Sequence, residues 1–128
     1  MQVEELEVSS LIFDPNNART HDEKNLNAIK GSLAKFGQQY PIVIDDKNVV
    51  LSGNVRLEAA KDLGWKTIKV VRSDLKTETE KVGYKLADNQ SAILADWDMD
   101  VLGSELHALR EDGFEIEDIG FQDTGLLQ

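Results

Sequence analysis

The chain has 128 residues, of which 41% are hydrophobic and 30% charged, a composition typical of one compact globular domain. It contains no cysteine, which excludes disulfides, thiolate zinc sites and thiol catalysis. The net charge of −10 opposes contact with a phosphate backbone, so we expect this domain alone to bind duplex DNA poorly, although acidity also serves solubility.

The first 71 residues interleave strand patterns with helix patterns. Alternating or short apolar runs predict strands, and apolar residues at helical spacing, preceded by capping residues and followed by glycine, predict helices. In chain order these patterns predict a strand over residues 4–8, a helix over 21–36, a hairpin of strands 42–44 and 49–51, a helix over 55–63 and a strand over 66–71.

The last third of the chain is expected to be helical. Thr77 and Glu80 form a capping box at its start. The predicted elements are a helix from residue 78 with a buried apolar stripe of Val82, Leu86 and Ile93, a break at Trp97, a helix from Asp98 to Gly113, and a short strand or turn over 114–121. Together the elements predict an α+β fold, a single compact domain over 1–121 with a small mixed sheet packed by helices. A tail or linker start over 122–128 follows.

Neither a membrane span nor a secretion signal is expected. No apolar run approaches the roughly 20 residues that a membrane helix needs. The first seven residues alternate acidic and apolar side chains, unlike a signal peptide. We therefore expect a cytoplasmic protein.

A candidate anion site lies where the strand ending at Ser52 meets the next helix. Gly53 lets an anion approach the backbone, and the N–H groups of Asn54 and Val55 lie at the electropositive helix start. Arg56, one turn in, offers a bidentate guanidinium. An ordinary turn, with Asn54 as the cap and Arg56 as a surface charge, explains the same local pattern.

Two polar residues outside this segment have two interpretations each. Asn89 falls on the apolar stripe of its helix, where an unpartnered buried amide costs roughly 1–3 kcal/mol. It therefore either caps a backbone group internally or faces a ligand. Arg19 ends a turn just before a helix, and it either adds a second cation to an anion site or is a solvated side chain near a cap.

Metal sites of familiar spacing are not indicated. His21 and His107 lack acidic or histidine partners at ligand spacing. The alternating acids Asp96, Asp98 and Asp100 are followed by neither the glycine nor the glutamate that a calcium loop requires.

Taken in order, three segments resemble the ParB/sulfiredoxin superfamily, which includes ParB N-terminal and "ParB-like nuclease" domains. Residues 37–44 (GQQYPIVI) resemble the family's QPIVV-type strand, and residues 51–60 (LSGNVRLEAA) resemble its GxxR phosphate-binding box. Residues 86–90 (LADNQ) are similar to its third motif, an acidic residue followed by asparagine inside a helix. The resemblance covers residues 4–121. Together with the Trp97–Asp98 turn and a closing GF element that follow it, this segment resembles the ParB-like domains of phages and prophages that commonly lie at the N-terminus of a DNA methyltransferase.

The resemblance implies a nucleotide-binding domain associated with phage or plasmid DNA modification or partition. Its expected ligand is ATP or CTP with Mg²⁺. Binding without turnover and slow hydrolysis, with a carboxylate such as Asp88 or Glu58 positioning a water, both stay open. The implied binding residues are Gly53, Asn54, Val55 and Arg56 at the phosphates, Asn89 near the triphosphate or as a Mg²⁺ ligand, Gln39 and Pro41 lining the pocket, and Arg19 as a further cation.

Departures from the family pattern limit what carries over. Asn54 stands where sulfiredoxin has its cysteine, which excludes sulfiredoxin chemistry, and Val55 and Glu58 replace arginines of chromosome-partitioning ParB, which argues against a CTP clamp. Helix-turn-helix and methyltransferase motifs are absent, so we expect a free-standing relative or part of a longer protein with a methyltransferase or other DNA-processing partner. The alternatives are a metal-dependent nuclease, a serine kinase relative, or an acidic interaction module with a vestigial pocket.

Overall fold

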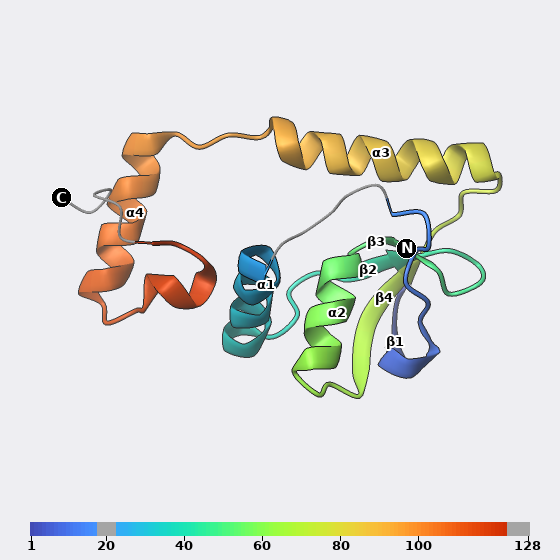
Figure 1. The fold of residues 1–128 in the computed structure, drawn as a ribbon, viewed down its shortest axis with the longest axis horizontal. Coiled ribbons are helices and arrows are strands. Elements are labelled where there is room, and N and C mark those ends of the chain that lie inside the picture. Colours follow the sequence, from blue (N-terminus) through green and yellow to red (C-terminus); the bar gives the residue numbers. More distant parts are fainter. Residues whose placement is uncertain (18–22, 123–128) are drawn as a thin grey trace.

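The computed structural model describes residues 1–17 and 23–122, and Figure 1 shows a sheet with one helix in front of it, a second helix beside the first, and a helical arm along one side. The elements in chain order are β1 (Val3–Glu7), η1 (Val8–Ser10), α1 (Glu23–Phe36), β2 (Ile42–Ile44), β3 (Val50–Ser52), α2 (Asn54–Asp62), β4 (Thr67–Arg72), α3 (Glu78–Leu94), α4 (Met99–Glu111) and η2 (Ile116–Ile119). The predicted α+β class is confirmed. The predicted tail lies almost wholly outside the described residues, and the start of the first predicted helix, residues 21–22, lies outside them too.

The four strands form one mixed sheet in the order β1-β4-β2-β3. β1 runs antiparallel to β4, with Leu6 opposite Ile68, and β4 runs parallel to β2. β2 and β3 form the predicted hairpin. Its turn places Asn48 at φ 67°, a left-handed conformation that asparagine adopts more readily than most residues.

The main core lies between the sheet and α2. α2 buries Leu57, Ala59 and Ala60, and α1 packs beside α2. The main cluster of buried side chains consists of Val8, Leu11, Ile42, Ile44, Val50, Leu57, Ala60, Ile68 and Val70. This core fixes the junction between β3 and α2, where the candidate anion site lies.

The face of α3 that packs against the rest of the domain is not the face that was predicted. Val82, Leu86 and Ile93 were expected to be buried, but they are 45%, 51% and 65% exposed. α3 instead docks on the edge of the sheet at β3 through its polar side, which includes Lys81 and Lys85.

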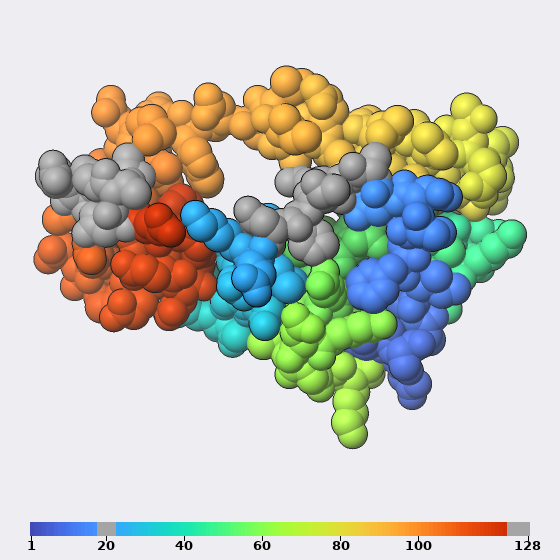
Figure 2. Space-filling view, in the orientation of Figure 1, coloured from blue at the N-terminus to red at the C-terminus, as the bar shows by residue number. Residues whose placement is uncertain are grey.

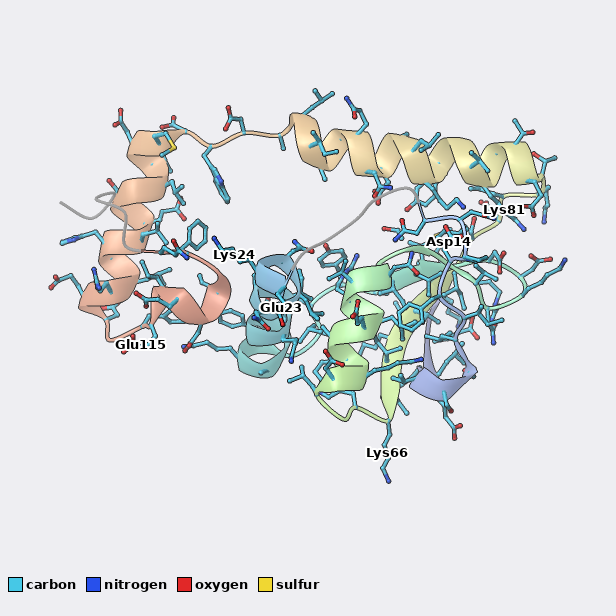
Figure 3. All side chains as sticks on the ribbon, viewed as in Figure 1. Asp14, Glu23, Lys24, Lys66, Lys81 and Glu115 are labelled. Carbon is cyan, nitrogen blue, oxygen red and sulfur yellow. The ribbon has the colours of Figure 1, made fainter. Side chains whose placement is uncertain are left out.

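Ion pairs explain why the polar side of α3 is the one that docks. Lys81 Nζ lies 3.6 Å from Asp45 Oδ2 and 3.2 Å from Asp46 Oδ1, and Lys85 Nζ lies 2.8 Å from Asp14 Oδ2 (Figure 3). Asp14, Asp45 and Lys81 are all buried. Because the loops at this edge present buried carboxylates, lysines compensate them better than leucine or isoleucine would.

The C-terminal part of the described chain forms a small helical unit. Leu102 and Leu106 of α4 bury against Ile116 of η2, with Leu109 and Phe121 around them. The predicted short strand or turn over 114–121 is a 3-10 helix, and this unit packs on α1.

Close backbone contact holds this unit in place. A Cβ added at Gly31 of α1 would overlap the carbonyl of Asp118, and Phe36 stacks on Phe114 with ring centroids 5.8 Å apart.

The predicted starts of the last two helices are confirmed, since Asp98 caps α4 and the Thr77 capping box begins α3. Within the described ranges, we find no helix with the length and apolarity that crossing a membrane requires.

Candidate functional site

The site begins at Gly53, the residue that joins β3 to α2. Gly53 is the N-cap residue of α2. Its φ of 111° is a conformation that side-chain-bearing residues rarely adopt. A Cβ here would lie 2.5 Å from Ile42 Cγ2 and 3.4 Å from Arg56 Nη2. Gly53 therefore lets the chain turn into α2 while its Cα stays against the core and beside the arginine.

The first turn of α2 provides the donors expected of an anion site. The N–H groups at a helix start have no partner within the helix, and the helix dipole makes this end electropositive. Asn54 fixes the position of this turn, because its Oδ1 accepts a hydrogen bond of 3.0 Å from the backbone N–H of Asp14. The N-terminal segment and α2 are thereby joined beside the site.

Arg56 is largely buried and its guanidinium is held on one side. Nη1 donates to the carbonyl oxygens of Tyr40 and Pro41, each at 3.4 Å, and Cζ lies 4.0 Å from the centroid of the Tyr40 ring. Burial lowers the pKa of Arg56, whereas Tyr40, Asp88 and Tyr84 raise it. An arginine pKa starts so high that the group stays charged.

The opposite wall of the site comes from α3. Ser52 Oγ donates a hydrogen bond of 2.8 Å to Asp88 Oδ2, which joins the end of β3 to α3. Burial, and then Asp88, raise the pKa of Tyr84, so its hydroxyl stays protonated at neutral pH. Asp88 is thus the carboxylate that faces Arg56 across the site.

These groups surround a cavity of about 280 Å³. In the space-filling view an open gap separates the C-terminal half of α3 from α1 (Figure 2). The lining residues come from five parts of the fold and are Asn17, Asn25, Ile29, Tyr40, Leu51, Ser52, Gly53, Asn54, Val55, Arg56, Asp88, Asn89 and Ala92.

The structure brings five of the predicted site residues to this cavity: Gly53, Asn54, Val55, Arg56 and Asn89. Asn89 lines the cavity because, like its neighbour Asp88, it lies on the side of α3 that faces the cavity.

The other three predicted site residues lie elsewhere. Gln39 Nε2 donates a hydrogen bond of 2.6 Å to the carbonyl oxygen of Phe36, at the end of α1. Pro41 does not line the cavity, although its backbone carbonyl accepts the hydrogen bond from Arg56 Nη1. Arg19 lies outside the described residues.

Sequence reasoning missed several lining residues: Asn25, Ile29, Tyr40, Ser52 and Ala92. For Asn25 and Ile29 a signal existed, since they are four residues apart and so share one face of α1. Nothing in the local pattern singled out Tyr40.

The negative charge of the chain lies mainly away from this cavity. Residues 96–122 contain nine acidic residues and one arginine, whereas residues 1–95 contain 14 acidic and 13 basic residues. The acidic segment forms α4 and η2, which lie on the far side of α1 from α2 (Figure 1). Arg56 and Asp88, rather than the net charge, therefore set the field in the cavity.

The cavity offers few ligands to a metal ion. No group of three or more histidine or acidic side chains that could hold a metal ion occurs in the described part of the chain. Asp88 and Asn89 provide one carboxylate and one amide. That set fits Mg²⁺, which commonly binds one or two carboxylates and completes its shell with water and phosphate oxygens.

Comparison with known proteins gives concordant results. Residues 1–90 match the family model of the ParB N-terminal domain. The ParB-like nuclease domain-containing protein YnaK of Escherichia coli K12 is 30% identical over 66 residues, which are 52% of this chain and 76% of YnaK.

Two solved structures share the fold. The C-terminally truncated chromosome-partitioning protein ParB of Caulobacter crescentus, complexed with CTP-γ-S, superposes with a TM-score of 0.76 at 19% identity, covering 93% of this chain and 75% of that one. Sulfiredoxin of Arabidopsis thaliana gives a TM-score of 0.53 at 25% identity, covering 67% of this chain and 98% of sulfiredoxin.

Proposed function

Since the chain belongs to the ParB N-terminal domain family, we propose that it binds the phosphate groups of a nucleoside triphosphate at the start of α2. The observation that carries the proposal is the position of Arg56, whose guanidinium lines a 280 Å³ cavity next to Gly53 and the first N–H groups of α2. A helix N-terminus with an adjacent arginine fork is suited to phosphate oxygens.

Each wall of the cavity has its own role in this proposal. The N–H groups of Asn54 and Val55, together with Arg56, bind phosphate oxygens, and the amide of Asn89 with the carboxylate of Asp88 binds the Mg²⁺ that accompanies a triphosphate. CTP is the first candidate, because the Caulobacter ParB that shares this fold was solved with CTP-γ-S, and ATP is the second.

Slow hydrolysis is a further part of the proposal. Asp88 accepts a hydrogen bond from Ser52 and lines the cavity, which supports a role in which its second oxygen orients a water near the terminal phosphate. The metal would offset negative charge on the phosphates, a role that a bound Mg²⁺ commonly has.

The cellular role that we propose is in phage or plasmid DNA modification or partition, in the cytoplasm, beside a DNA methyltransferase or another DNA-processing protein. The LADNQ motif at residues 86–90 supports it. A nuclease is the alternative suggested by the name of YnaK. Nicking of supercoiled plasmid with Mg²⁺ or Mn²⁺ that disappears in Arg56→Ala would favour that alternative.

A thermal-shift panel tests nucleotide binding. CTP, ATP, GTP, UTP and their diphosphates are each added with and without Mg²⁺. A ligand at 100 times its dissociation constant stabilises the protein by about 2.7 kcal/mol, on the order of several degrees for a domain of this size. We expect such a shift with at least one triphosphate.

Two variants decide whether the shift comes from this cavity. Arg56→Ala is expected to abolish it. Lys66→Ala removes an exposed cation that projects from the opposite end of the molecule, and it should leave the shift unchanged (Figure 3). A flat panel with well-folded protein would contradict the proposal and favour the acidic interaction module.

A further inference from the structure

Tyr40 combines an exposed ring with a fixed partner. Its side chain lies between α1 and β2 and is 65% exposed, yet its ring covers the guanidinium of Arg56 at 4.0 Å. A large exposed aromatic ring contributes little to the core. Because the ring lies at the cavity, we infer its role from its contact with Arg56 and not from packing in the core.

Without the ring, Arg56 would be held only weakly. The two hydrogen bonds from Nη1 to the carbonyl oxygens of Tyr40 and Pro41 are long, at 3.4 Å each. Across the cavity the carboxylate of Asp88 attracts the guanidinium. A flexible arginine with weak anchors would therefore turn toward Asp88 and neutralise it, leaving fewer donors for an anion.

The ring opposes that movement in a way that preserves the donors. Cation–π stacking occupies one flat face of the guanidinium and leaves its N–H edges available. Nη2 stands 3.4 Å from the position that a Cβ of Gly53 would occupy, so this edge lies beside the start of α2. The arginine fork and the helix N–H groups thus border the same space.

We propose that Tyr40 is a positioning residue whose aromatic ring holds the Arg56 guanidinium in its anion-binding orientation. The inference rests on the proposed function and deepens it, because it makes phosphate affinity depend on a residue outside the GxxR segment. The aromatic ring of Tyr40, and not its hydroxyl, is what raises the affinity. The gain in affinity concerns the phosphate portion of the ligand and not the base.

Calorimetric titration with two ligands tests this assignment. CTP and inorganic tripolyphosphate, each with Mg²⁺, are titrated into the wild type, Tyr40→Phe and Tyr40→Leu. We expect Tyr40→Leu to weaken both ligands equally, by about three- to fivefold, the size of an exposed cation–π contact. Tyr40→Phe should stay within about twofold of the wild type, because phenylalanine keeps the ring.

Two results would overturn the inference. Unchanged binding by Tyr40→Leu would show that the ring does not act on the site. A loss confined to CTP, with tripolyphosphate unaffected, would show that the ring stacks on the base. Phe36→Leu is the matched control, since Phe36 is another exposed ring, on Phe114, and its loss should leave both affinities unchanged.

A measurement without ligand separates this inference from the proposed function. The order parameter of the Arg56 Nε–H bond, from ¹⁵N relaxation, should be high in the wild type and in Tyr40→Phe and should fall in Tyr40→Leu. Equal order in all three proteins would overturn the inference whatever the ligand data show. Failure of the wild type to bind either ligand would instead contradict the proposed function.

Discussion

The substitution Gly53→Ala tests the geometry of the site through stability. Gly53 has a φ of 111°, and an added Cβ would lie 2.5 Å and 2.9 Å from two atoms of Ile42, a side chain with no exposed surface. The left-handed backbone costs about 1–2 kcal/mol for a residue with a Cβ, and overpacking the core adds about 1–3 kcal/mol.

We therefore expect Gly53→Ala to lower the free energy of unfolding by about 2–5 kcal/mol, measured by urea denaturation. Gly64→Ala is the matched control, because Gly64 also has a positive φ, of 77°, but a Cβ there would meet nothing within 4 Å. It should cost only the backbone term, about 1–2 kcal/mol. Equal losses in the two variants would refute the claim that the β3–α2 junction needs glycine for space as well as for conformation.

Two further predictions concern the docking of α3. Lys85→Met leaves the buried carboxylate of Asp14 without its lysine and should cost about 2–4 kcal/mol in urea denaturation, whereas Lys66→Met at an exposed site should stay within about 0.5 kcal/mol. Lys81 holds the pKa of Asp46 below its ordinary value of 3.8, so this pair stabilises the fold above that pH, and its contribution is lost as the pH falls through the lowered pKa. The urea midpoint of the wild type should therefore fall more steeply than that of Asp46→Asn below about pH 4, and parallel curves would contradict the role of the pair.

The fold could be predicted from the sequence where local patterns suffice. The hairpin, α2 and the capping box at Thr77 depend on short-range features such as turn residues, helix caps and glycines, and these appear in the structure close to the expected residues. The segment from Gly53 to Arg56 is of the same kind, because a glycine before a helix and an arginine one turn later already define the geometry of the site.

The orientation of α3 could not be read from its own periodicity. Val82, Leu86 and Ile93 form a regular stripe, and the stripe predicted burial. The buried carboxylates of Asp14 and Asp45, from distant loops, decide instead that the lysine-bearing side docks. An amphipathic pattern shows that two faces differ, but which face packs depends on partners elsewhere in the chain.

Tyr40 shows the same limit within the site. It lies 16 residues before Arg56, and only the parallel pairing of β2 with β4 and the packing of α2 bring the ring over the guanidinium. The expected pocket residues Gln39 and Pro41 flank it in the sequence. Of these three residues only Tyr40 lines the cavity, and a contact so distant in sequence leaves no local pattern.

The most direct test of the account is to map the bound nucleotide onto the backbone. ¹H–¹⁵N NMR spectra are recorded during titration with CTP and Mg²⁺. We predict the largest shifts at the amides of residues 53–57 and at Asp88 and Asn89, with residues 99–118 unperturbed. Saturable shifts centred elsewhere, or none at all up to millimolar CTP, ATP, GTP and UTP, would contradict a phosphate site at the start of α2.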